Sequence, residues 1–292
     1  MDIVLSIITV NYNGLAYTCA LIDTIPFGSL PMEVIVVDNG SAQDEASQIA
    51  AKYPNIRTIR SKKNLGFAGG NNLGIQAAKG RYIYLVNNDT EFPSPWNVEA
   101  MIKRLESSVE IGVVCPKIRF SWSTKPIQFA GYTPLSAITL RNHALGYGEE
   151  DHGQHDVPHP TPYAHGAAMM FKREVVEKAG LMPECYFLYY EELDWSLQIC
   201  HAGFEIWYDP CSTIYHKESK TTGQDSALRT YYVCRNRLLF ARRNISGIHL
   251  ILCYIYIIGI VSIRDMLKYL LKGRTDLLKA ILRGIRDFIK MR

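Results

Sequence analysis

The sequence predicts an α/β protein built around a largely parallel sheet. Short apolar, β-branched runs alternate with segments of helix length along the first 115 residues. This alternation is typical of βαβ units, in which helices cover both faces of a buried sheet. The 292-residue chain is 48% hydrophobic, which is enough for a substantial core. Strands are expected at 3–10, 33–37, 56–60, 82–86 and 111–114, and helices between them at 15–25, 42–53, 70–79 and 95–108.

The regular pattern weakens after the fifth predicted strand. Residues 116–165 are rich in Pro, Gly and aromatic residues, which predicts irregular strands and a mobile loop. Regularity returns with a helix around 174–180, another at 191–202, and a strand-like run at 212–215. The first half of the chain is therefore the more regular part of the predicted sheet.

The C-terminal part changes character. Residues 248–263 are nearly all apolar, but the run is shorter than the ~20 residues that a transmembrane helix needs. Interfacial insertion or burial in a core is therefore expected in place of spanning. From 264 to 292 apolar residues recur at helical spacing beside nine Lys or Arg and three Asp residues, which predicts a basic amphipathic helix or pair of helices.

Charge and cysteine content exclude several classes of protein. The net charge is +4, and because residues 264–292 contribute +6, the remainder carries about −2. Nucleic acid is not an expected partner, because the basic tail is interleaved with Leu and Ile and not with exposed aromatic residues. Seven scattered cysteines without a C-x-x-C pair indicate neither a disulfide framework nor a zinc site, and favour a reducing cytosol.

Polar side chains follow three predicted strands at the point where each strand ends. They are Asn11 and Asn13 after the first strand, Asp38 after the second, and Asn87, Asn88 and Asp89 after the strand at 82–86. Ligands bind at the carboxyl ends of strands in open α/β sheets. Any one of these clusters also suits a turn, but three in register favour one shared binding site.

A glycine-rich segment precedes the third helix. Gly66, Gly69 and Gly70 lie within NLGFAGGNNLG (64–74), and their spacing matches neither the dinucleotide nor the Walker motif. Glycines permit close approach of a ligand to the backbone, and a helix start favours an anion. A tight loop explains the segment equally well.

Two further clusters have side chains suited to chemistry. Glu191, Glu192 and Asp194 lie beside aromatic residues, where they suit either a general base or the acidic start of a helix. His216 follows the strand-like run at 212–215, and the polar residues 219–223 come soon after it. Phosphate or metal contacts are expected there, although a lone histidine is more often structural.

Taken in order, these segments resemble the inverting family 2 glycosyltransferases, and most closely their bacterial rhamnosyltransferase-like branch. The segments that carry the likeness are VNYN (10–13), VVDNGS (36–41), NLGFAGGNN (64–72), LVNNDT (85–90), HGAAMMF (165–171), FLYYEELDW (187–195) and HKESKTTG (216–223). The resemblance spans about residues 3–240 and implies the GT-A fold, with a Rossmann-like sheet. It implies a catalytic domain at 1–240, with a nucleotide-binding half at about 1–110 and an acceptor-binding half at 111–240. The hydrophobic and basic pattern of residues 241–292 predicts a separate helical segment that associates with a membrane.

The resemblance implies roles for individual residues on the nucleotide side. Those expected to border the nucleotide are Val10, Asn11, Asn13, Asp38, Asn64, Gly66, Phe67, Gly69, Asn72 and Asn88. Asp38 would bond the base, and Arg235 with Arg237 would lie near the phosphates. The expected donor nucleotide is dTDP or UDP.

The resemblance also implies a divalent metal, Mg²⁺ or Mn²⁺. Asp89 matches the last position of the family's D-x-D motif, which binds the metal on the donor diphosphate. The first position is Asn87, so this chain offers one carboxylate where many relatives offer two, and the diphosphate supplies further oxygen ligands. His216 matches a family position that completes the metal or diphosphate site.

The implied activity is inverting transfer of a sugar to a hydroxyl group. Glu192 matches the general base, where the family usually has Asp, and Glu191 with Asp194 would hold the helix start or contact the sugars. The leading donor is dTDP-rhamnose, and the acceptor is a bacterial surface polysaccharide or a lipid-linked oligosaccharide. A UDP-sugar-dependent transferase of the same fold and a non-catalytic nucleotide-binding module are the alternatives.

The basic tail fits an acceptor held at a membrane. Anionic lipids of the cytoplasmic leaflet attract Lys and Arg near a surface by roughly 1 kcal/mol each. The N-terminus has no basic region before its apolar residues, which argues against a signal peptide. We therefore expect a cytoplasmic protein, peripheral on the inner face of the cell membrane; the sequence leaves its oligomeric state open.

Overall fold

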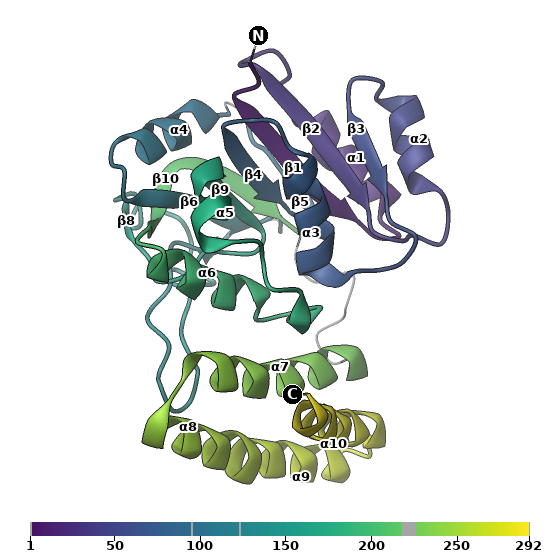
Figure 1. Cartoon of the computed structure of the whole chain (residues 1–292), viewed down its shortest axis with the longest axis vertical. Helices are drawn as coiled ribbons and strands as arrows, with labels where there is room; N and C mark the ends of the chain where they lie inside the picture. The colour runs from purple at the N-terminus through teal and green to yellow at the C-terminus, as the bar shows by residue number, and fades with distance from the viewer. Residues whose placement is uncertain (1, 95, 123, 218–225, 292) are drawn as a thin grey trace. The chain divides into compact units, whose positions relative to one another are not determined.

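The computed structural model describes residues 2–94, 96–122, 124–217 and 226–291 (Figure 1). The chain divides into two compact units. The first comprises Met1–Thr133, His143–Phe187 and Glu191–Glu218, and the second Pro134–Asn142, Leu188–Tyr190 and Ser219–Arg292. The expected end of the catalytic domain, at 240, lies inside helix α7 (Ala227–Asn244), which belongs to the second unit.

One mixed sheet forms the centre of the first unit. Among the described residues its ten strands include the order β3-β2-β1-β4-β9-β6-β10-β5, with β7 on β6 and β8 on β10. The strands are β1 (Leu5–Asn11), β2 (Met32–Asp38), β3 (Arg57–Arg60), β4 (Tyr82–Val86), β5 (Thr90–Glu91), β6 (Ile111–Phe120), β7 (Ile127–Phe129), β8 (His159–Pro160), β9 (Ala168–Lys172) and β10 (Glu205–His216). Strands β1 to β4 are mutually parallel, and β9 lies antiparallel between β4 and β6. The predicted α/β fold is confirmed.

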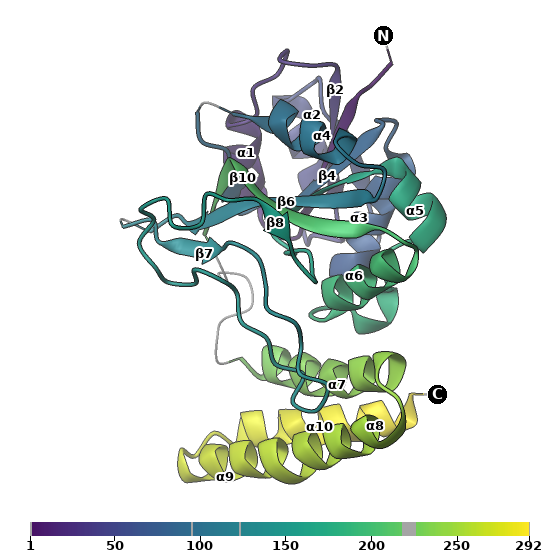
Figure 2. The ribbon, with the colours of Figure 1, turned by 90° about the vertical axis from the view of Figure 1, so that its left-hand side faces the viewer.

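Helices cover both faces of this sheet. They are α1 (Leu15–Asp23), α2 (Glu45–Lys52), α3 (Gly66–Ala77), α4 (Val98–Glu106), α5 (Arg173–Ala179), the 3₁₀ turn η1 (Glu184–Tyr186) and α6 (Glu191–His201). Helices α3, α5 and α6 lie on one face, and α1 and α4 lie on the other (Figures 1 and 2). Ligands bind at the carboxyl ends of strands in open α/β sheets, so the loops that follow β1, β2 and β4 can form a site.

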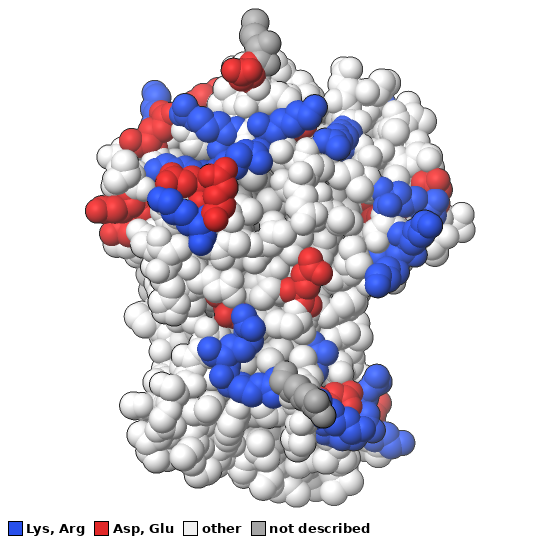
Figure 3. Space-filling model, in the orientation of Figure 1, with Lys and Arg blue, Asp and Glu red and all other residues white. Residues whose placement is uncertain are grey.

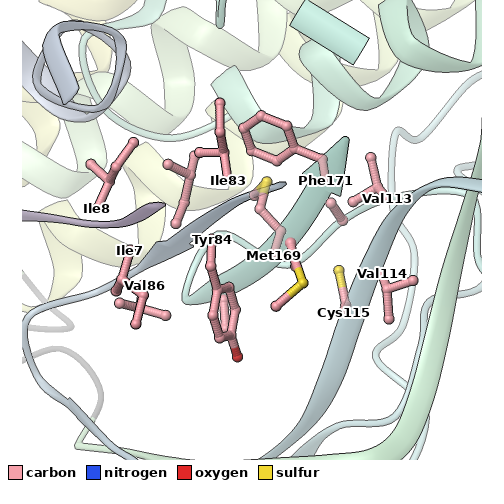
Figure 4. Close-up of a cluster of buried hydrophobic side chains, with 14 of the residues drawn as sticks. Ile7, Ile8, Ile83, Tyr84, Val86, Val113, Val114, Cys115, Met169 and Phe171 are labelled. Carbon is pink, nitrogen blue, oxygen red and sulfur yellow. The ribbon is translucent and has the colours of Figure 1, made fainter. Parts of the chain in front are cut away.

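The core lies between these layers. Fully buried side chains from β1, β4, β6 and β9 interdigitate in Figure 4, among them Ile7, Ile83, Val113 and Phe171. All five residues of β4 are buried, which explains its uninterrupted apolar sequence. The polar residues after β4 therefore mark the point at which the chain leaves the core.

Two expectations about the middle of the chain are corrected. Helix α3 begins at Gly66, not at 70, so Gly69 and Gly70 lie inside the helix and not in a loop before it. A Cβ atom at Gly70 would lie 2.8 Å from Val10 Cγ1, so the glycine lets α3 approach β1 closely. The weak pattern after 115 also concealed a long strand, because β6 continues to Phe120.

The second unit is helical. It contains α7, α8 (Gly247–Tyr254), the π-helix η2 (Ile255–Ser262), α9 (Ile263–Leu271) and α10 (Thr275–Lys290). Helices α7 and α10 pack together, and Tyr231 Oη donates to Asp287 Oδ2 at 3.0 Å. The basic tail was expected to form one amphipathic helix or a pair, and it forms the pair α9 and α10. Helix α7 was not predicted.

One helical segment of this unit is long and apolar. Helices α8, η2 and α9 are continuous from Gly247 to Leu271, a span of 25 residues whose most apolar 18-residue window has a mean hydropathy of 2.0. By length and composition alone this segment could cross a membrane. It is longer than the apolar run seen in the sequence, because the helix continues through the first basic residues. Only 22% of its most apolar window is buried, so its side chains do not form a closed core.

Candidate active site

The ends of β1 and β2 are joined by buried polar contacts. Asn11 and Asp38 are register partners, and both side chains are inaccessible to solvent. Asn11 Nδ2 donates to Glu45 Oε2 at 2.6 Å, and Asn11 Oδ1 accepts from Thr18 Oγ1 at 2.7 Å. Ser41 Oγ accepts from the backbone amide of Asn13 at 2.8 Å. These bonds fix the loops after both strands, because buried polar groups are costly unless they are satisfied.

One carboxylate oxygen of Asp38 accepts no hydrogen bond from the described residues. Its Oδ1 lies 3.4 Å from Asn11 Nδ2, whereas Oδ2 is buried without a hydrogen bond from any residue that the structure describes. The nearest cation to Oδ2 is Arg60 Nε, at 3.6 Å. An oxygen in this position can accept a hydrogen bond from a ligand once the side chain that covers it moves.

The loop before α3 is held against the end of β2. Asn39 Nδ2 donates to Gly66 O at 2.9 Å, and Asn39 Oδ1 accepts from the amide of Leu65 at 3.0 Å. Asn64 Oδ1 accepts from the amide of Gly66 at 2.8 Å. Gly66 has a φ of 75°, and a Cβ atom there would lie 2.1 Å from Phe187 O. Only glycine fits at this position, because any side chain would collide with the backbone of the loop before α6.

Three elements converge beside Glu192. A Cβ atom on Gly166 would lie 3.7 Å from Phe67 Cζ and 3.8 Å from Glu192 Cγ. Ser196 Oγ accepts from the amide of Ala164 at 3.0 Å, which ties α6 to the residues before β9. The start of α3, the residues around Gly166 and the start of α6 therefore meet at one place, with a carboxylate among them.

The environment of Glu192 affects its ionisation. Burial raises the pKa of Glu192 above the ordinary carboxyl value, because the charged form loses hydration. Glu191 and Asp194 are themselves buried, and Asp194 Oδ2 accepts from Tyr186 Oη at 2.8 Å. Asp194 thus holds the loop before α6, which is one of the two roles expected for it. The side chain of Glu192 is half-buried.

The loop before α6 has an unusual backbone. Phe187, Tyr189 and Tyr190 have φ values of 68°, 70° and 78°. Bulky residues rarely adopt this left-handed region, and each such residue costs on the order of 1–3 kcal/mol. Strained backbone persists only where its surroundings fix it, and it is common at functional sites.

Asp89 and His216 face each other at the end of β4. Strand β5 follows Asp89 and pairs with the last residues of β10, which brings His216 Nε2 to 3.1 Å from Asp89 Oδ1. Gln128 Oε1, on β7, lies 2.8 Å from His216 Nδ1. An amide oxygen can only accept, so this contact places a proton on Nδ1 and leaves Nε2 facing the carboxylate.

This pair fits part of a metal site. An imidazole nitrogen and one carboxylate oxygen are ligands suited to Mn²⁺, and carboxylate oxygens also suit Mg²⁺. Among the described residues, no three His, Cys, Asp or Glu side chains gather as a metal cluster. Asp89 and His216 would therefore hold a cation only together with ligands from water or from a bound diphosphate.

His165 connects this pair to the neighbourhood of Glu192. Its ring lies 6.5 Å from that of His216, and the next residue in the chain is Gly166. Burial, and then the charge of His216, lower the pKa of His165 to about 3, so the ring is neutral at physiological pH. The histidine pair, Asp89 and Glu192 thus belong to one continuous region of the first unit.

Several of the expected site residues have other partners. Asn72 donates to Met182 O and to Glu184 Oε1, both at 2.9 Å, so its amide holds the segment before α6. Asn88 Nδ2 donates to Thr18 Oγ1 at 3.1 Å, and the backbone N–H of Asn87 donates to Ala167 O at 2.9 Å. Gly69 lies inside α3, and the side chain of Val10 faces that helix.

The two expected arginines lie on α7 in the second unit. Arg235 Nε donates to Asn236 Oδ1 at 2.8 Å, and Arg237 donates to Thr139 O. The polar residues expected at 219–223 lie outside the described residues. Phosphate contacts by these groups stay predictions.

Sequence reasoning missed Gln128, Glu45, Ser41 and Glu184. Gln128 and Glu45 act on predicted site residues from other elements, since they hold His216 and Asn11 respectively. Nothing in the sequence marks Gln128, which lies in the irregular region on a strand of three residues. Ser41 and Glu45 closely follow Asp38, so their proximity to that predicted residue was the available signal.

Comparison with known proteins identifies the family. The model of "Glycosyl transferase family 2" matches residues 6–180, which is more than half of the chain and contains Asn11, Asp38 and Asp89. The chain belongs to glycosyl transferase family 2. As a family 2 glycosyltransferase it is an enzyme, and the predicted family is confirmed.

Curated relatives of this glycosyltransferase are distant. The low-salt glycan biosynthesis hexosyltransferase Agl10 of Haloferax volcanii is 26% identical over 80% of this chain and 74% of its own length. The N-acetylglucosaminyl-diphospho-decaprenol L-rhamnosyltransferase of Mycobacterium tuberculosis is 24% identical over 68% of this chain and 70% of its own length. Protein y4gI of Sinorhizobium fredii is 25% identical over 66% of this chain, which spans only 22% of that relative.

Solved structures show the same fold. S. aureus TarS 1–349 in complex with UDP-GlcNAc has a TM-score of 0.60 at 16% identity, covering 99% of this chain and 81% of TarS 1–349. The mannosyltransferase PcManGT from Pyrobaculum calidifontis, in complex with GDP-Man and Mn²⁺, has a TM-score of 0.58 at 15% identity, covering 100% and 76%. At this level of identity the likeness establishes the fold alone, which is the predicted GT-A fold.

Proposed function

We propose that this family 2 glycosyltransferase transfers a sugar with inversion, with dTDP-rhamnose as the leading donor. The acceptor is a hydroxyl of a surface polysaccharide or a lipid-linked oligosaccharide. The observation that carries the proposal is the position of Glu192, half-buried beside Gly166 and Phe67 at the end of α6 that faces the start of α3. The rhamnosyltransferase among the curated relatives supports the choice of donor.

The donor nucleotide would lie over the loops that follow β1, β2 and β3. Asp38 Oδ2, which forms no hydrogen bond with the described residues, would accept from the imide N–H of thymine or uracil after Arg60 moves aside. Asn13, Asn64 and Gly66 would border the ribose. Asp89 and His216 would hold a divalent cation, whose chemistry is to neutralise charge on the departing diphosphate.

Glu192 would then perform the proton transfer. Its carboxylate removes a proton from the acceptor hydroxyl, whose oxygen forms a bond to the anomeric carbon. The bond from that carbon to the diphosphate oxygen breaks at the same time, and the diphosphate leaves with the electron pair. Because the hydroxyl attacks the opposite face, the anomeric configuration inverts. The raised pKa of Glu192 suits this role, since a base is most effective when its pKa approaches the working pH.

A panel of sugar nucleotides with Mn²⁺ or Mg²⁺ tests the donor. A ligand at 100 times its Kd stabilises the folded state by about 2.7 kcal/mol, which raises the melting temperature measurably. We expect dTDP-rhamnose to give the largest shift and to be hydrolysed or transferred. A larger shift with a UDP-sugar would instead support the UDP-dependent alternative.

We further propose that the second unit binds an anionic membrane surface. Residues 245–263 contain no Lys, Arg, Asp or Glu, and the surface over α8 is uncharged in Figure 3. Ile248, Ile251 and Ile255 are more than half exposed at helical spacing, and Leu271 is 89% exposed. An exposed apolar face beside basic helices is typical of an interfacial helix. This supports a location on the inner face of the cell membrane.

Replacing Ile251 and Ile255 together with Asp is expected to lower vesicle binding at least tenfold. Burying one such side chain contributes about 1.5–3 kcal/mol, so losing two outweighs the attraction of one or two basic residues. Flotation with anionic vesicles measures the effect. Val109→Asp is the matched control, because Val109 is 83% exposed in the first unit. Equal binding by the double variant and the wild type would contradict the proposal, and resistance to alkaline extraction would indicate spanning.

A further inference from the structure

The turn formed by Leu188–Tyr190, directly before α6, is contacted by a buried side chain of α7. Asn236 is inaccessible to solvent, and its Nδ2 donates to Leu188 O at 2.7 Å and to Tyr189 O at 2.9 Å. A carboxamide nitrogen has two donor hydrogens, and these two contacts use both of them. Asn236 Oδ1 accepts from Arg235 Nε at 2.8 Å, which orients the amide so that its nitrogen faces the turn.

Helix α7 makes a second contact with this turn, through a ring. The turn residues Tyr189 and Tyr190 have positive φ values without being glycine, so the free chain would favour another conformation. Both carbonyls that Asn236 binds belong to this stretch, and the ring of Tyr190 packs 5.6 Å from that of Phe240 on the same helix. Helix α7 therefore supplies both a polar and an apolar contact to the turn.

The turn is joined directly to the proposed base. Tyr190 is followed by Glu191, the first residue of α6, and then by Glu192. We propose that Asn236 is a positioning residue for Glu192, acting through the backbone of Leu188–Tyr190. This inference rests on the proposed role of Glu192. A general base must lie within hydrogen-bond reach of the proton that it removes, and a displacement of about 1 Å can cost on the order of 10²-fold in rate.

Asn236→Ala tests this role, because it deletes both donors without adding a charge. The expected result is a fall in kcat of about 10–100-fold, with the KM for the sugar nucleotide changed less than twofold. The acid limb of the pH–kcat profile should also move toward the ordinary carboxyl pKa, since a displaced Glu192 is less buried. A residue needed only for folding would not move this limb.

Two further variants complete the test. Asn244→Ala is the matched control, because Asn244 lies on the same helix and donates to Phe240 O at 3.1 Å; its kcat should stay at the wild-type value. Asn236→Gln retains the two donors on a longer side chain and should recover part of the lost kcat. If Asn236→Ala proves unstable, the kcat and the pH profile of Asn236→Gln are compared with those of the wild type in its place.

The outcomes separate this inference from the proposed function. If Asn236→Ala keeps the wild-type kcat, or alters kcat and KM together without moving the pH profile, Asn236 is not a positioning residue. Glu192 would still be the base in that case, provided that Glu192→Gln is inactive. A fully active Glu192→Gln would overturn both, because no base would remain for Asn236 to position.

Discussion

Replacing Glu192 with Gln is expected to lower the rate of sugar transfer by about 10²–10⁴-fold while the sugar nucleotide still binds. The amide has nearly the same shape as the carboxylate but cannot accept a proton from the acceptor hydroxyl. Single-turnover kinetics with the donor, together with calorimetric titration of the nucleotide, measure both quantities. The binding constant should change little, because Glu192 acts on the acceptor and not on the nucleotide.

The pH dependence and two controls make this result specific. Burial raises the pKa of Glu192, so the wild-type rate should climb with pH through a value above the ordinary carboxyl range. Since the folded state disfavours the charged carboxylate, Gln at this position should leave thermal stability at neutral pH unchanged or higher. Glu192→Asp should retain part of the rate, and Glu177→Gln, at an exposed position of α5, should retain all of it. Full turnover in Glu192→Gln would eliminate Glu192 as the base.

Removing divalent metal is expected to weaken donor binding at least tenfold. Asp89 and His216 supply only two ligands, so metal and diphosphate should each bind better in the presence of the other. Titration of the nucleoside diphosphate with and without chelator measures this coupling directly. His216→Ala should reproduce the loss in the presence of metal, because the imidazole nitrogen facing Asp89 is then absent.

The control for this experiment is His201→Ala, an exposed histidine at the end of α6. It should bind metal and nucleotide as the wild type does. Undiminished donor affinity and turnover in excess chelator would contradict the metal assignment. Asn87, in place of a second carboxylate, would then mark a transferase that works without metal.

The N-terminal part of the sheet could be predicted well from sequence because its signals are local. Strands β1, β2 and β4 are uninterrupted apolar runs, and each is followed by polar residues that the parallel sheet brings to one edge. The pairing of Asn11 with Asp38 follows from this register. The role of base was expected for Glu192 in particular only from family resemblance, since acidic residues at a helix start are equally typical of a structural role.

The remaining features depend on contacts between distant segments. The contact between Gln128 and His216 forms only because β7 pairs with β6 and because β10 places His216 beside β7. Asn236 lies in a helix that no sequence pattern predicted, and its partners are backbone carbonyls 47 and 48 residues away. The start of α3 was misplaced because glycines predict a loop, whereas here close packing of α3 against β1 requires them inside a helix.

The anomeric configuration of the product tests the central claim most directly. NMR of the product formed from the preferred sugar nucleotide and an acceptor hydroxyl reports whether the new linkage has the configuration of the donor or its opposite. Single displacement with Glu192 as base predicts complete inversion, and formation of this product about 10²–10⁴-fold more slowly in Glu192→Gln. Retention of the donor configuration would contradict the proposed mechanism, because it requires two successive displacements or a different arrangement of the reacting groups.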